Sequence, residues 1–358
     1  MGRSTRGGAY GPHGATRATA GWVLVPASAV GYHAAMRAMI MRALGEPAEL
    51  ELVELPDPIP GPGQVAIDVE ASGCNFADVL LCRGKYQLKA EPPFTPGSEV
   101  AGKVRALGAG VTGLRVGQAV CAQLGAGGFA SIALADARRV QAIPEGMPAV
   151  DAAAMGVVYL SAWLALDDRA RIEPGEQLLV QAAAGGVGLA AVQLGRALHA
   201  RVIAAVGSAD KLGACREHGA HEALCTADAD WPEQVRALTD GRGADVVLES
   251  VGGDVLEGSL KCIAWAGRLV VVGFSSGDIP AVRLNRVMLK HIALLGLNLG
   301  GYHEHSPEKL KQGMQQLTAL YAQGMRPPIH GAYRLEEAGK ALTELAARRT
   351  TGKVVLKG

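Results

Sequence analysis

The chain has 358 residues, which is long for a single compact core, so two domains are the expected arrangement. It is 49% hydrophobic and 19% charged, a composition typical of a folded protein with a large buried volume. Its 35 basic and 34 acidic residues leave a net charge of +1, which provides no field of one sign for nucleic acid or an anionic membrane. No apolar run reaches the length of a membrane span, so neither partner is expected.

The cysteines are scattered along the chain and include no C-x-x-C pair, so they indicate neither a disulfide framework nor a metal ribbon. Their positions are Cys74, Cys82, Cys121, Cys215, Cys225 and Cys262. Buried free thiols in a reducing compartment are the favoured interpretation, and a cytoplasmic location is therefore expected.

The first 35 residues differ in composition from the rest, because they carry arginines and no acidic residue appears before Glu46. Such a segment could be a targeting peptide, although its apolar stretch "WVLVPASAV" is short and contains a proline. It could also reflect a mis-assigned start, since Met36 opens "MRAMIMRALGEPAEL", a plausible native beginning. We expect residues 1–35 to be a disordered or artefactual extension.

Residues 36–150 are rich in proline and glycine and contain short β-branched runs separated by turn signals such as "PDPIPGPG". The runs read "QVAIDVEA", "EVAGKV" and "QAVCAQL". This pattern predicts a compact antiparallel barrel or sandwich.

From about residue 155 apolar strands alternate with amphipathic helices. The strands read "EQLLVQAA", "RVIAAVG", "EALCTA", "ADVVLESV", "RLVVVGF" and "IALLGLNL". Helices are predicted between them, among them "GVGLAAVQLGRALH" and "DVLEGSLKCIAWAG". Six such strands predict a doubly wound parallel sheet in an α/β domain. From residue 301 two further helices and a closing strand, "KVVLK", complete the chain.

A glycine-rich turn joins the first of these strands to its helix, with Gly185, Gly186 and Gly188 at the junction. Missing side chains let the backbone approach a pyrophosphate, and the positive end of the helix stabilises its charge. Placed between strand and helix in a six-strand series, the pattern indicates a dinucleotide site more strongly than a packing turn. The first glycine of the fingerprint is replaced here by Ala183.

The end of the second strand favours NADPH over NADH. An NAD site usually places Asp or Glu there to bind the ribose 2′-hydroxyl, whereas this chain has Gly207, Ser208 and Lys211. A hydroxyl and an ammonium attract a 2′-phosphate that a carboxylate would repel. The alternative for Lys211 is a solvated lysine in the first turn of a helix.

Five stretches together resemble the zinc-independent quinone oxidoreductases related to zeta-crystallin, within the medium-chain dehydrogenase/reductase superfamily. They are "PDPIPGPGQVAIDVEASGCNFADVL", "PFTPGSEVAGKV", "AAAGGVGLAAVQLG", "GADVVLESVGGD" and "RLVVVGFSSG". The resemblance implies a GroES-like catalytic domain (36–156 and 301–358), an inserted Rossmann domain (157–300) and a cleft between them. It also implies Val187 and Phe274 as cofactor contacts, and a homodimer paired through Rossmann edge strands.

The resemblance implies that no metal is bound. Zinc-dependent relatives carry a Cys at the position of Asn75 and a His at the position of Ser98, and neither ligand is present. Cys74 is one residue off, which on a strand points its side chain to the other side. Packing is the favoured role for Cys74 and for Cys82.

Hydrogen bonds would then have to polarise the substrate oxygen. The segment from Asn75 to Tyr86 resembles the active-site strand and loop of quinone and enoyl reductases, with Asn75 offering an amide donor and Tyr86 a phenol that donates a proton. By residue type alone, Asn75 is as readily a turn former and Tyr86 a half-buried packing residue. Asp78 is expected to be structural.

The predicted function is an oxidoreductase that transfers a hydride from NADPH to a quinone. The alternative substrates are α,β-unsaturated carbonyls or enoyl thioesters, for which Arg83, Lys85 and Lys89 leave room at the cleft mouth. A second alternative is a non-catalytic, crystallin-like NADPH-binding protein. Zinc-dependent alcohol oxidation is the least favoured hypothesis.

Overall fold

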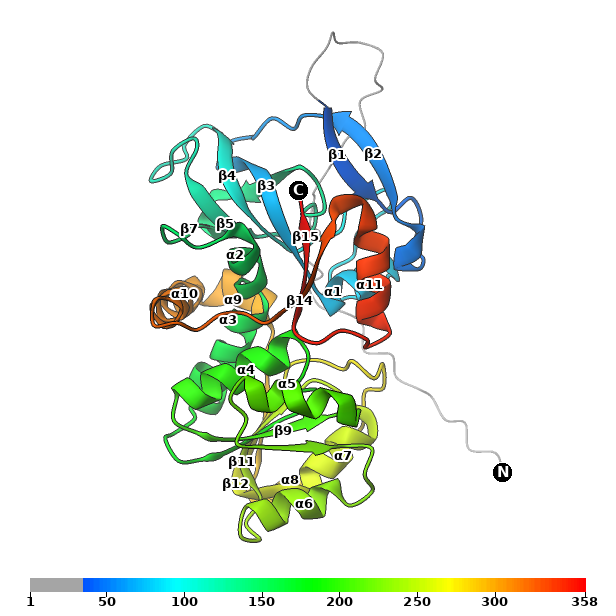
Figure 1. The fold of residues 1–358 in the computed structure, drawn as a ribbon, viewed down its shortest axis with the longest axis vertical. Helices are drawn as coiled ribbons and strands as arrows, with labels where there is room; N and C mark the ends of the chain where they lie inside the picture. The colour runs from blue at the N-terminus through cyan, green and yellow to red at the C-terminus, as the bar shows by residue number, and fades with distance from the viewer. Residues whose placement is uncertain (1–34) are drawn as a thin grey trace, which may run out of the picture.

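The computed structural model of the protein describes residues 35–358 and divides into two halves along its long axis (Figure 1). The upper half holds most of the early strands together with the C-terminal strand, and the lower half holds a second sheet (Figure 1). The extension expected at residues 1–35 lies outside the described residues, except for Ala35, which begins the first strand.

The upper half is built on a mixed seven-stranded sheet. Its strands run in the order β14-β15-β3-β4-β5-β7, with β6 pairing on β3, and β1 and β2 form a separate hairpin. The bounds are β1 (Ala35–Ile40), β2 (Glu51–Pro56), β3 (Gln64–Cys74), β4 (Glu99–Leu107), β5 (Ala119–Gln123), β6 (Ile132–Asp136), β7 (Val140–Ala142), β14 (Ile329–Arg334) and β15 (Lys353–Lys357). Register shifts along β3 and β4 bend the sheet, as bulges do in barrels. Antiparallel pairing predominates, as predicted.

The lower half is a six-stranded parallel sheet, which confirms the predicted doubly wound domain. Its order is β10-β9-β8-β11-β12-β13, the Rossmann order. The strands are β8 (Gln177–Val180), β9 (Arg201–Val206), β10 (Glu222–Cys225), β11 (Ala244–Glu249), β12 (Ile263–Val271) and β13 (Ala293–Gly296). The central strands are almost wholly buried because helices cover both faces.

Helices connect and cover these sheets. They are α1 (Phe76–Cys82), α2 (Ala149–Met155), α3 (Val158–Trp163), α4 (Gly186–Ala197), α5 (Leu212–Glu217), α6 (Trp231–Leu238), α7 (Gly253–Cys262), α8 (Leu284–Lys290), α9 (Leu299–His305), α10 (Pro307–Ala322) and α11 (Ala338–Ala346). One prediction was wrong in extent: "CIAWAG" was expected to be helical, but α7 ends at Cys262 and β12 begins at Ile263. The β-branched Ile263 already pairs with Ala244 of β11, so sheet pairing prevails over the helical pattern.

One helical stretch corrects the expectation that no apolar run reaches the length of a membrane span. Residues Ala149–Ala170 comprise α2, α3 and a π-helical turn (Leu164–Ala170), and by length and composition alone they could cross a bilayer. In the fold, 78% of the relevant window is buried within the protein. The stretch therefore serves as the core helix that leads from the upper sheet into the lower one.

The chain returns to the upper half after the parallel sheet. Helix α10 places Leu310, Leu317 and Tyr321 in the same apolar cluster as the strands and helices of the Rossmann half. The upper sheet is rejoined only at β14, which lies parallel to β15, and β15 lies antiparallel to β3. The predicted domain boundaries at 156 and 300 stay predictions, but the sheet itself resumes at Ile329.

Candidate active site

The glycine-rich turn after β8 has the geometry of a dinucleotide cradle. A Cβ on Gly188 would lie 2.6 Å from the Cα of Ala183 and closer still to the carbonyl oxygen of Ala182, so close packing of α4 on the turn requires glycine there. Around Gly185 the nearest atom to such a Cβ is the same carbonyl oxygen, at 3.4 Å, so this side of the turn is open. The first N–H groups of α4 have no partner within the helix and are the donors that a pyrophosphate at this turn would use.

The turn forms without the first glycine of the fingerprint. Ala183 is fully buried and donates its backbone N–H to the carbonyl of Ala205 (3.0 Å). The left-handed conformation falls on Ala182, at φ 48°, rather than on Ala183. The alanine at 183 therefore stabilises the junction of β8 with β9 and does not obstruct the opening at Gly185.

The predicted 2′-phosphate residues lie together at the end of β9. Gly207 and Ser208 are exposed, and Lys211 ends a short 3-10 turn (Ala209–Lys211). The Lys211 ammonium donates to the carbonyl oxygens of Arg348 (2.6 Å) and Thr350 (3.1 Å), which belong to the upper half. Lys211 therefore joins the two halves beside the end of β9, and its contact with a phosphate stays a prediction.

Arg348 forms a second contact between the two halves. It donates from Nη2 to the carbonyl of Ser275 (2.8 Å), in the loop after β12. That loop also holds Phe274, which is half-buried and whose ring packs against Gly252 at the start of α7. Val187, in the first turn of α4, is half-buried. Arg348 was not expected from the sequence, because it lies 137 positions from Lys211.

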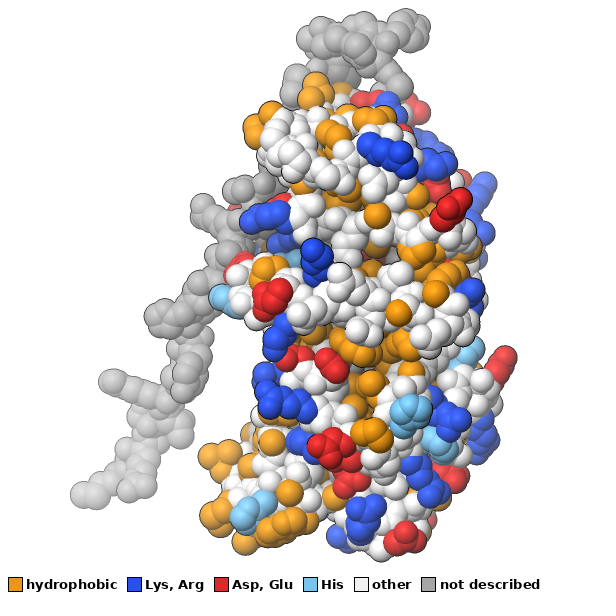
Figure 2. Space-filling view, turned by 90° about the vertical axis from the view of Figure 1, so that its left-hand side faces the viewer, with side chains coloured by type: hydrophobic (Ala, Val, Ile, Leu, Met, Phe, Trp, Pro, Cys, Tyr) orange, Lys and Arg blue, Asp and Glu red, His pale blue; other side chains and the backbone are white. Residues whose placement is uncertain are grey.

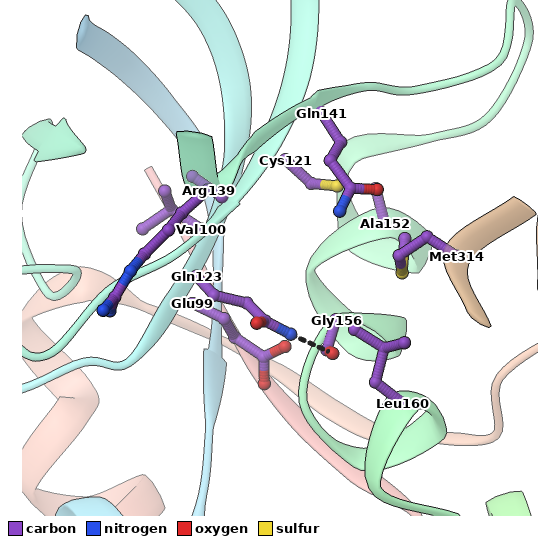
Figure 3. A pocket seen from close by; sticks show the side chains of 11 residues that line it. Glu99, Val100, Cys121, Gln123, Arg139, Gln141, Ala152, Gly156, Leu160 and Met314 are labelled. Atoms are coloured by element: carbon purple, nitrogen blue, oxygen red, sulfur yellow. Dashed lines mark hydrogen bonds between the residues drawn. The ribbon is translucent and has the colours of Figure 1, made fainter. Parts of the chain in front are cut away.

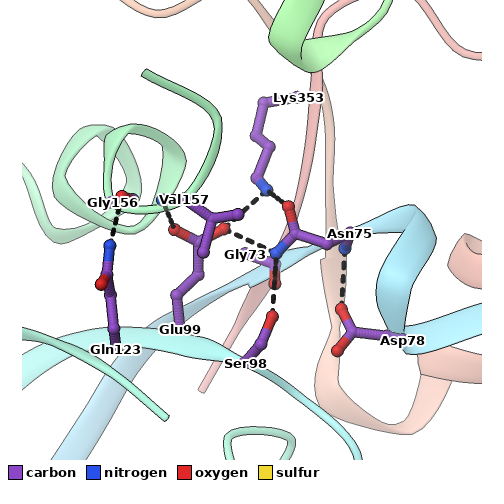
Figure 4. Close-up of polar contacts among 9 residues, drawn as sticks. All are labelled: Gly73, Asn75, Asp78, Ser98, Glu99, Gln123, Gly156, Val157 and Lys353. Atoms are coloured by element: carbon purple, nitrogen blue, oxygen red, sulfur yellow. Dashed lines mark hydrogen bonds and ion pairs between the residues drawn. The ribbon is translucent and has the colours of Figure 1, made fainter. Parts of the chain in front are cut away.

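The second group of polar side chains is buried where β3, β4 and β15 meet (Figure 4). Asn75 follows β3 and directs its side chain into this group. Its Nδ2 donates to Glu99 Oε1 (2.8 Å) and to Ser98 Oγ (3.1 Å), and its Oδ1 accepts from Lys353 Nζ (2.6 Å). Both amide hydrogens thus already have protein acceptors. A substrate carbonyl could use Asn75 only by displacing Ser98, so Asn75 as a substrate donor stays a prediction.

Sequence reasoning missed the other two members, Glu99 and Lys353, which form a buried ion pair. Their Oε1 and Nζ atoms are 2.6 Å apart, and the side chains are 2% and 3% exposed. Glu99 Oε2 also accepts the backbone N–H of Val157 (2.7 Å), at the start of α3. The only available signal was a pair of charged residues within apolar strands, in "SEVAG" and "GKVVL".

Asp78 holds the backbone of Asn75 in place. It is 1% exposed, and its Oδ2 accepts the backbone N–H of Asn75 (2.8 Å), which fixes the entry into α1. Burial raises the pKa of Asp78 to about 7, although the backbone donors and Lys353 partly oppose the increase. Asp78 is structural, as expected, and it titrates close to neutral pH.

Tyr86 is half-buried against the apolar cluster that contains Cys74 and Cys82. Among residues 35–358 no hydrogen-bond partner is found for its hydroxyl. Burial, together with the nearby charge of Asp78, raises the pKa of the Tyr86 phenol, so the group keeps its proton. Both cysteines are buried free thiols packed on apolar side chains, and burial raises the pKa of each, which supports the packing role.

A single strand connects the cofactor turn with the buried polar group. Gly352 forms a bridge with Gly185 and donates its N–H to the carbonyl of Ala184 (2.8 Å). The next residue, Lys353, begins β15 and contacts Asn75 and Glu99. The open face of the dinucleotide turn and the buried polar group are therefore one residue apart on β15.

This arrangement agrees with known proteins. The family described as "Alcohol dehydrogenase GroES-like domain" matches residues 61–145 of this chain. The family described as "Zinc-binding dehydrogenase" matches residues 186–319. A GroES-like half joined to a Rossmann half defines a medium-chain dehydrogenase/reductase. The quinone oxidoreductase-like protein 2 of Rattus norvegicus is 39% identical over 325 residues, covering 89% of this chain and 91% of that protein.

Two bacterial proteins narrow the assignment from the superfamily to one of its families. The quinone oxidoreductase of Pseudomonas aeruginosa is 36% identical, covering 88% of this chain and 97% of its own. The structure of Escherichia coli quinone oxidoreductase complexed with NADPH superimposes with a TM-score of 0.84 at 31% identity, covering 90% of this chain and all of that one. The chain belongs to the quinone oxidoreductase family, as the resemblance implied.

Proposed function

We propose that this protein reduces quinones with NADPH and without a metal. The observation that carries the proposal is the position of β15, which holds the dinucleotide turn through Gly352 and the Asn75 group through Lys353. A cofactor bound along the turn would extend toward that group, which is the arrangement that hydride transfer between cofactor and substrate requires.

NADPH fits the residues at the cofactor turn. The turn is open at Gly185, the first N–H groups of α4 have no partner within the helix, and the residues directly after β9 are Gly207 and Ser208 rather than a carboxylate, although Asp210 follows two positions later. Ser208 and Lys211 lie at that position, and the E. coli relative is described in complex with NADPH. When bound, the cofactor supplies a hydride.

The chain's own residues would hold the substrate and stabilise the charge that develops on its oxygen. Tyr86 keeps its proton because burial and Asp78 raise the pKa of the phenol, so it can donate a hydrogen bond to a reduced oxygen. Asn75 is held rigidly by Glu99, Ser98 and Lys353. Because the polar groups around Asn75 are held in fixed positions, they are pre-organised to stabilise charge that develops during hydride transfer.

The proposal of a metal-free site rests on the ligand positions. Asn75 and Ser98 occupy the two positions where zinc-dependent relatives place Cys and His, and their side chains bond to each other at 3.1 Å. Neutral amide and hydroxyl groups are poor zinc ligands compared with thiolate and imidazole. No cluster of three or more metal-ligating side chains occurs within residues 35–358.

The decisive experiment is a screen of NADPH oxidation against quinones, enones and enoyl thioesters, with and without a chelator. We expect turnover with quinones that survives chelation, in protein without stoichiometric zinc. Loss of activity on chelation, restored by zinc, would overturn the metal-free proposal. Inactivity with every acceptor, despite NADPH binding, would favour the non-catalytic alternative.

Enoyl thioesters remain a second candidate class, and the basic residues near Tyr86 bear on it. Arg83 is paired with Glu46 (2.7 Å), and the Lys89 ammonium donates to the carbonyl of Gly84 (2.9 Å). Lys85 is exposed. Only the charge of Arg83 is compensated by a carboxylate, whereas Lys85 and Lys89 keep theirs, so enoyl thioesters stay a second candidate class beside quinones.

We also propose that two copies pair along β13. This strand is the edge of the parallel sheet, with β12 as its sheet neighbour, so its outer backbone groups can pair with another strand. Figure 2 shows hydrophobic side chains gathered at the lower left, over the Rossmann half. Large apolar residues exposed near this edge are Trp265, Leu284, Met288, Leu289 and Leu294. Light scattering should give a dimer that Leu294→Lys disrupts, and a monomeric wild-type chain would contradict the proposal.

A further inference from the structure

The buried ion pair of Glu99 and Lys353 has a feature that orienting Asn75 does not need. Lys353 has three N–H donors, and two of them reach Glu99 Oε1 and Asn75 Oδ1, each at 2.6 Å. No acceptor for the third is found among the described residues. A neutral donor could orient the amide of Asn75 equally well, whereas a buried charge pair carries a desolvation cost.

A small pocket with a mixed polar and apolar lining reaches Glu99 from the side of β5 and β7 (Figure 3). The half-exposed side chains of Gln123, Arg139 and Gln141 line it together with the buried Glu99. Its interior volume is about 10 Å³, which is close to the least that one water molecule needs. Gln123 Nε2 donates a hydrogen bond to the carbonyl oxygen of Gly156 (2.5 Å), which holds this side of the pocket in place.

These two observations place an ionisable chain between solvent and the substrate side. The half-exposed glutamines and the buried Glu99 line the same pocket, and Glu99 contacts Lys353, which contacts Asn75. Within this chain Glu99 and Lys353 are joined by a hydrogen bond, and both groups can carry a proton. We propose that the pocket, Glu99 and Lys353 form a proton inlet that supplies the proton consumed when the substrate is reduced.

The inlet rests on the proposed reductase function, in which one proton is needed for each hydride transferred. A hydride adds two electrons and one hydrogen to a quinone and leaves a hydroquinone anion, which needs one proton. One N–H bond of Lys353 breaks, its electron pair stays on the nitrogen, and an O–H bond forms on the product. The amine then takes a proton through Glu99 from water in the pocket, so one solvent proton is consumed per turnover.

The test compares quinones whose hydroquinone anions differ in basicity. A strongly basic product anion needs the proton inside the site, whereas a weakly basic one can leave and be protonated in solution. With Glu99→Gln we expect turnover to fall roughly tenfold or more for electron-rich quinones and much less for electron-poor ones. The solvent isotope effect on turnover of electron-rich quinones should increase. A uniform loss across the series, or no loss, would overturn the inlet.

Two further variants keep the test decisive if Glu99→Gln folds poorly. The double variant Glu99→Gln/Lys353→Met removes both charges together, which buried pairs often tolerate, and it should show the same dependence on quinone basicity. Gln141→Leu makes the pocket mouth apolar without touching the pair, and it should raise the solvent isotope effect. NADPH titration and thermal melting of each variant establish that it is folded and binds cofactor.

Ser72→Ala is the matched control. Ser72, on β3, is a polar residue that is buried as Asn75 is. Its hydroxyl donates to the carbonyl oxygen of Gly128 (2.6 Å), which does not line the pocket. We expect any loss in this variant to be equal for all quinones. A wild-type protein inactive with every acceptor would refute the reductase function itself, whereas an active wild type with uniformly affected variants would refute the inlet alone.

Discussion

The cofactor turn and the polar group around Asn75 are built in opposite ways. The cofactor turn consists of backbone from one continuous stretch, in which open space at Gly185 and tight packing at Gly188 shape the cradle. The Asn75 group consists of side chains from three distant segments, with a buried charge pair at its centre. The cofactor side therefore depends on open and filled space, whereas the Asn75 group depends on paired charge, so each can be disturbed separately.

The largest effect is expected from breaking the charge pair. Lys353→Met leaves the Glu99 carboxylate buried without its counterion (Figure 4), and the free energy of unfolding should fall by about 3–5 kcal/mol. Urea unfolding measures this change. The double variant Glu99→Gln/Lys353→Met should recover much of the loss, and a single variant as stable as wild type would show that the pair is not charged.

Asp78 should give the next largest effect, as a pH dependence of stability. Its pKa is raised to about 7 in the folded protein, so the folded state holds a proton that the unfolded state releases above about pH 4. The contribution of Asp78 to stability is therefore fully present below pH 4 and is lost as the pH rises through 7, by up to about 1.4 kcal/mol per pH unit.

Asp78→Asn removes this dependence while its amide oxygen can still accept the N–H of Asn75. The difference in unfolding free energy between wild type and Asp78→Asn should change between pH 4 and 7 and level off above. A difference that stays constant over this range would show that Asp78 is ionised throughout.

On the cofactor side, Gly188→Ala should lower stability and NADPH affinity together. The added Cβ overlaps the backbone of Ala182 and Ala183, and overpacking of this kind costs about 1–3 kcal/mol. Thermal melting and NADPH titration measure the two effects. Gly213→Ala, on α5 with open space around its Cβ, is the control and should melt no lower than wild type. Equal behaviour of the two variants would contradict the tight packing at Gly188.

The smallest expected effect is on cofactor choice. Ser208→Asp places a carboxylate at the exposed end of β9, and the preference for NADPH over NADH should fall roughly tenfold, or about 1.4 kcal/mol. Ser208→Ala tests the hydroxyl without adding charge and should change the preference less. The ratio of kcat/KM for the two cofactors measures the effect, and an unchanged ratio in Ser208→Asp would place the 2′-phosphate elsewhere.

Much of this molecule could be predicted from its sequence, because the informative patterns are local. The six parallel strands, the glycine turn before α4 and the buried cysteines each follow from periodicity or composition within a short window. The boundary between α7 and β12 could not be predicted, since "CIAWAG" continues a helical pattern and only pairing with β11 makes it a strand. The apolar stretch Ala149–Ala170 is likewise assigned to the core by its burial.

The sequence by itself determined the family, the two-domain α/β architecture and the site of the cofactor turn, because backbone-built features are encoded where they occur. The tertiary structure alone decided that Glu99 and Lys353 complete the group around Asn75, since these residues lie 254 positions apart and meet only when β15 pairs with β3 beside β4. It also decided that the Lys211 ammonium lies against Arg348 and Thr350. Long-range contacts of this kind depend on strand pairing, and no local pattern in the chain records them.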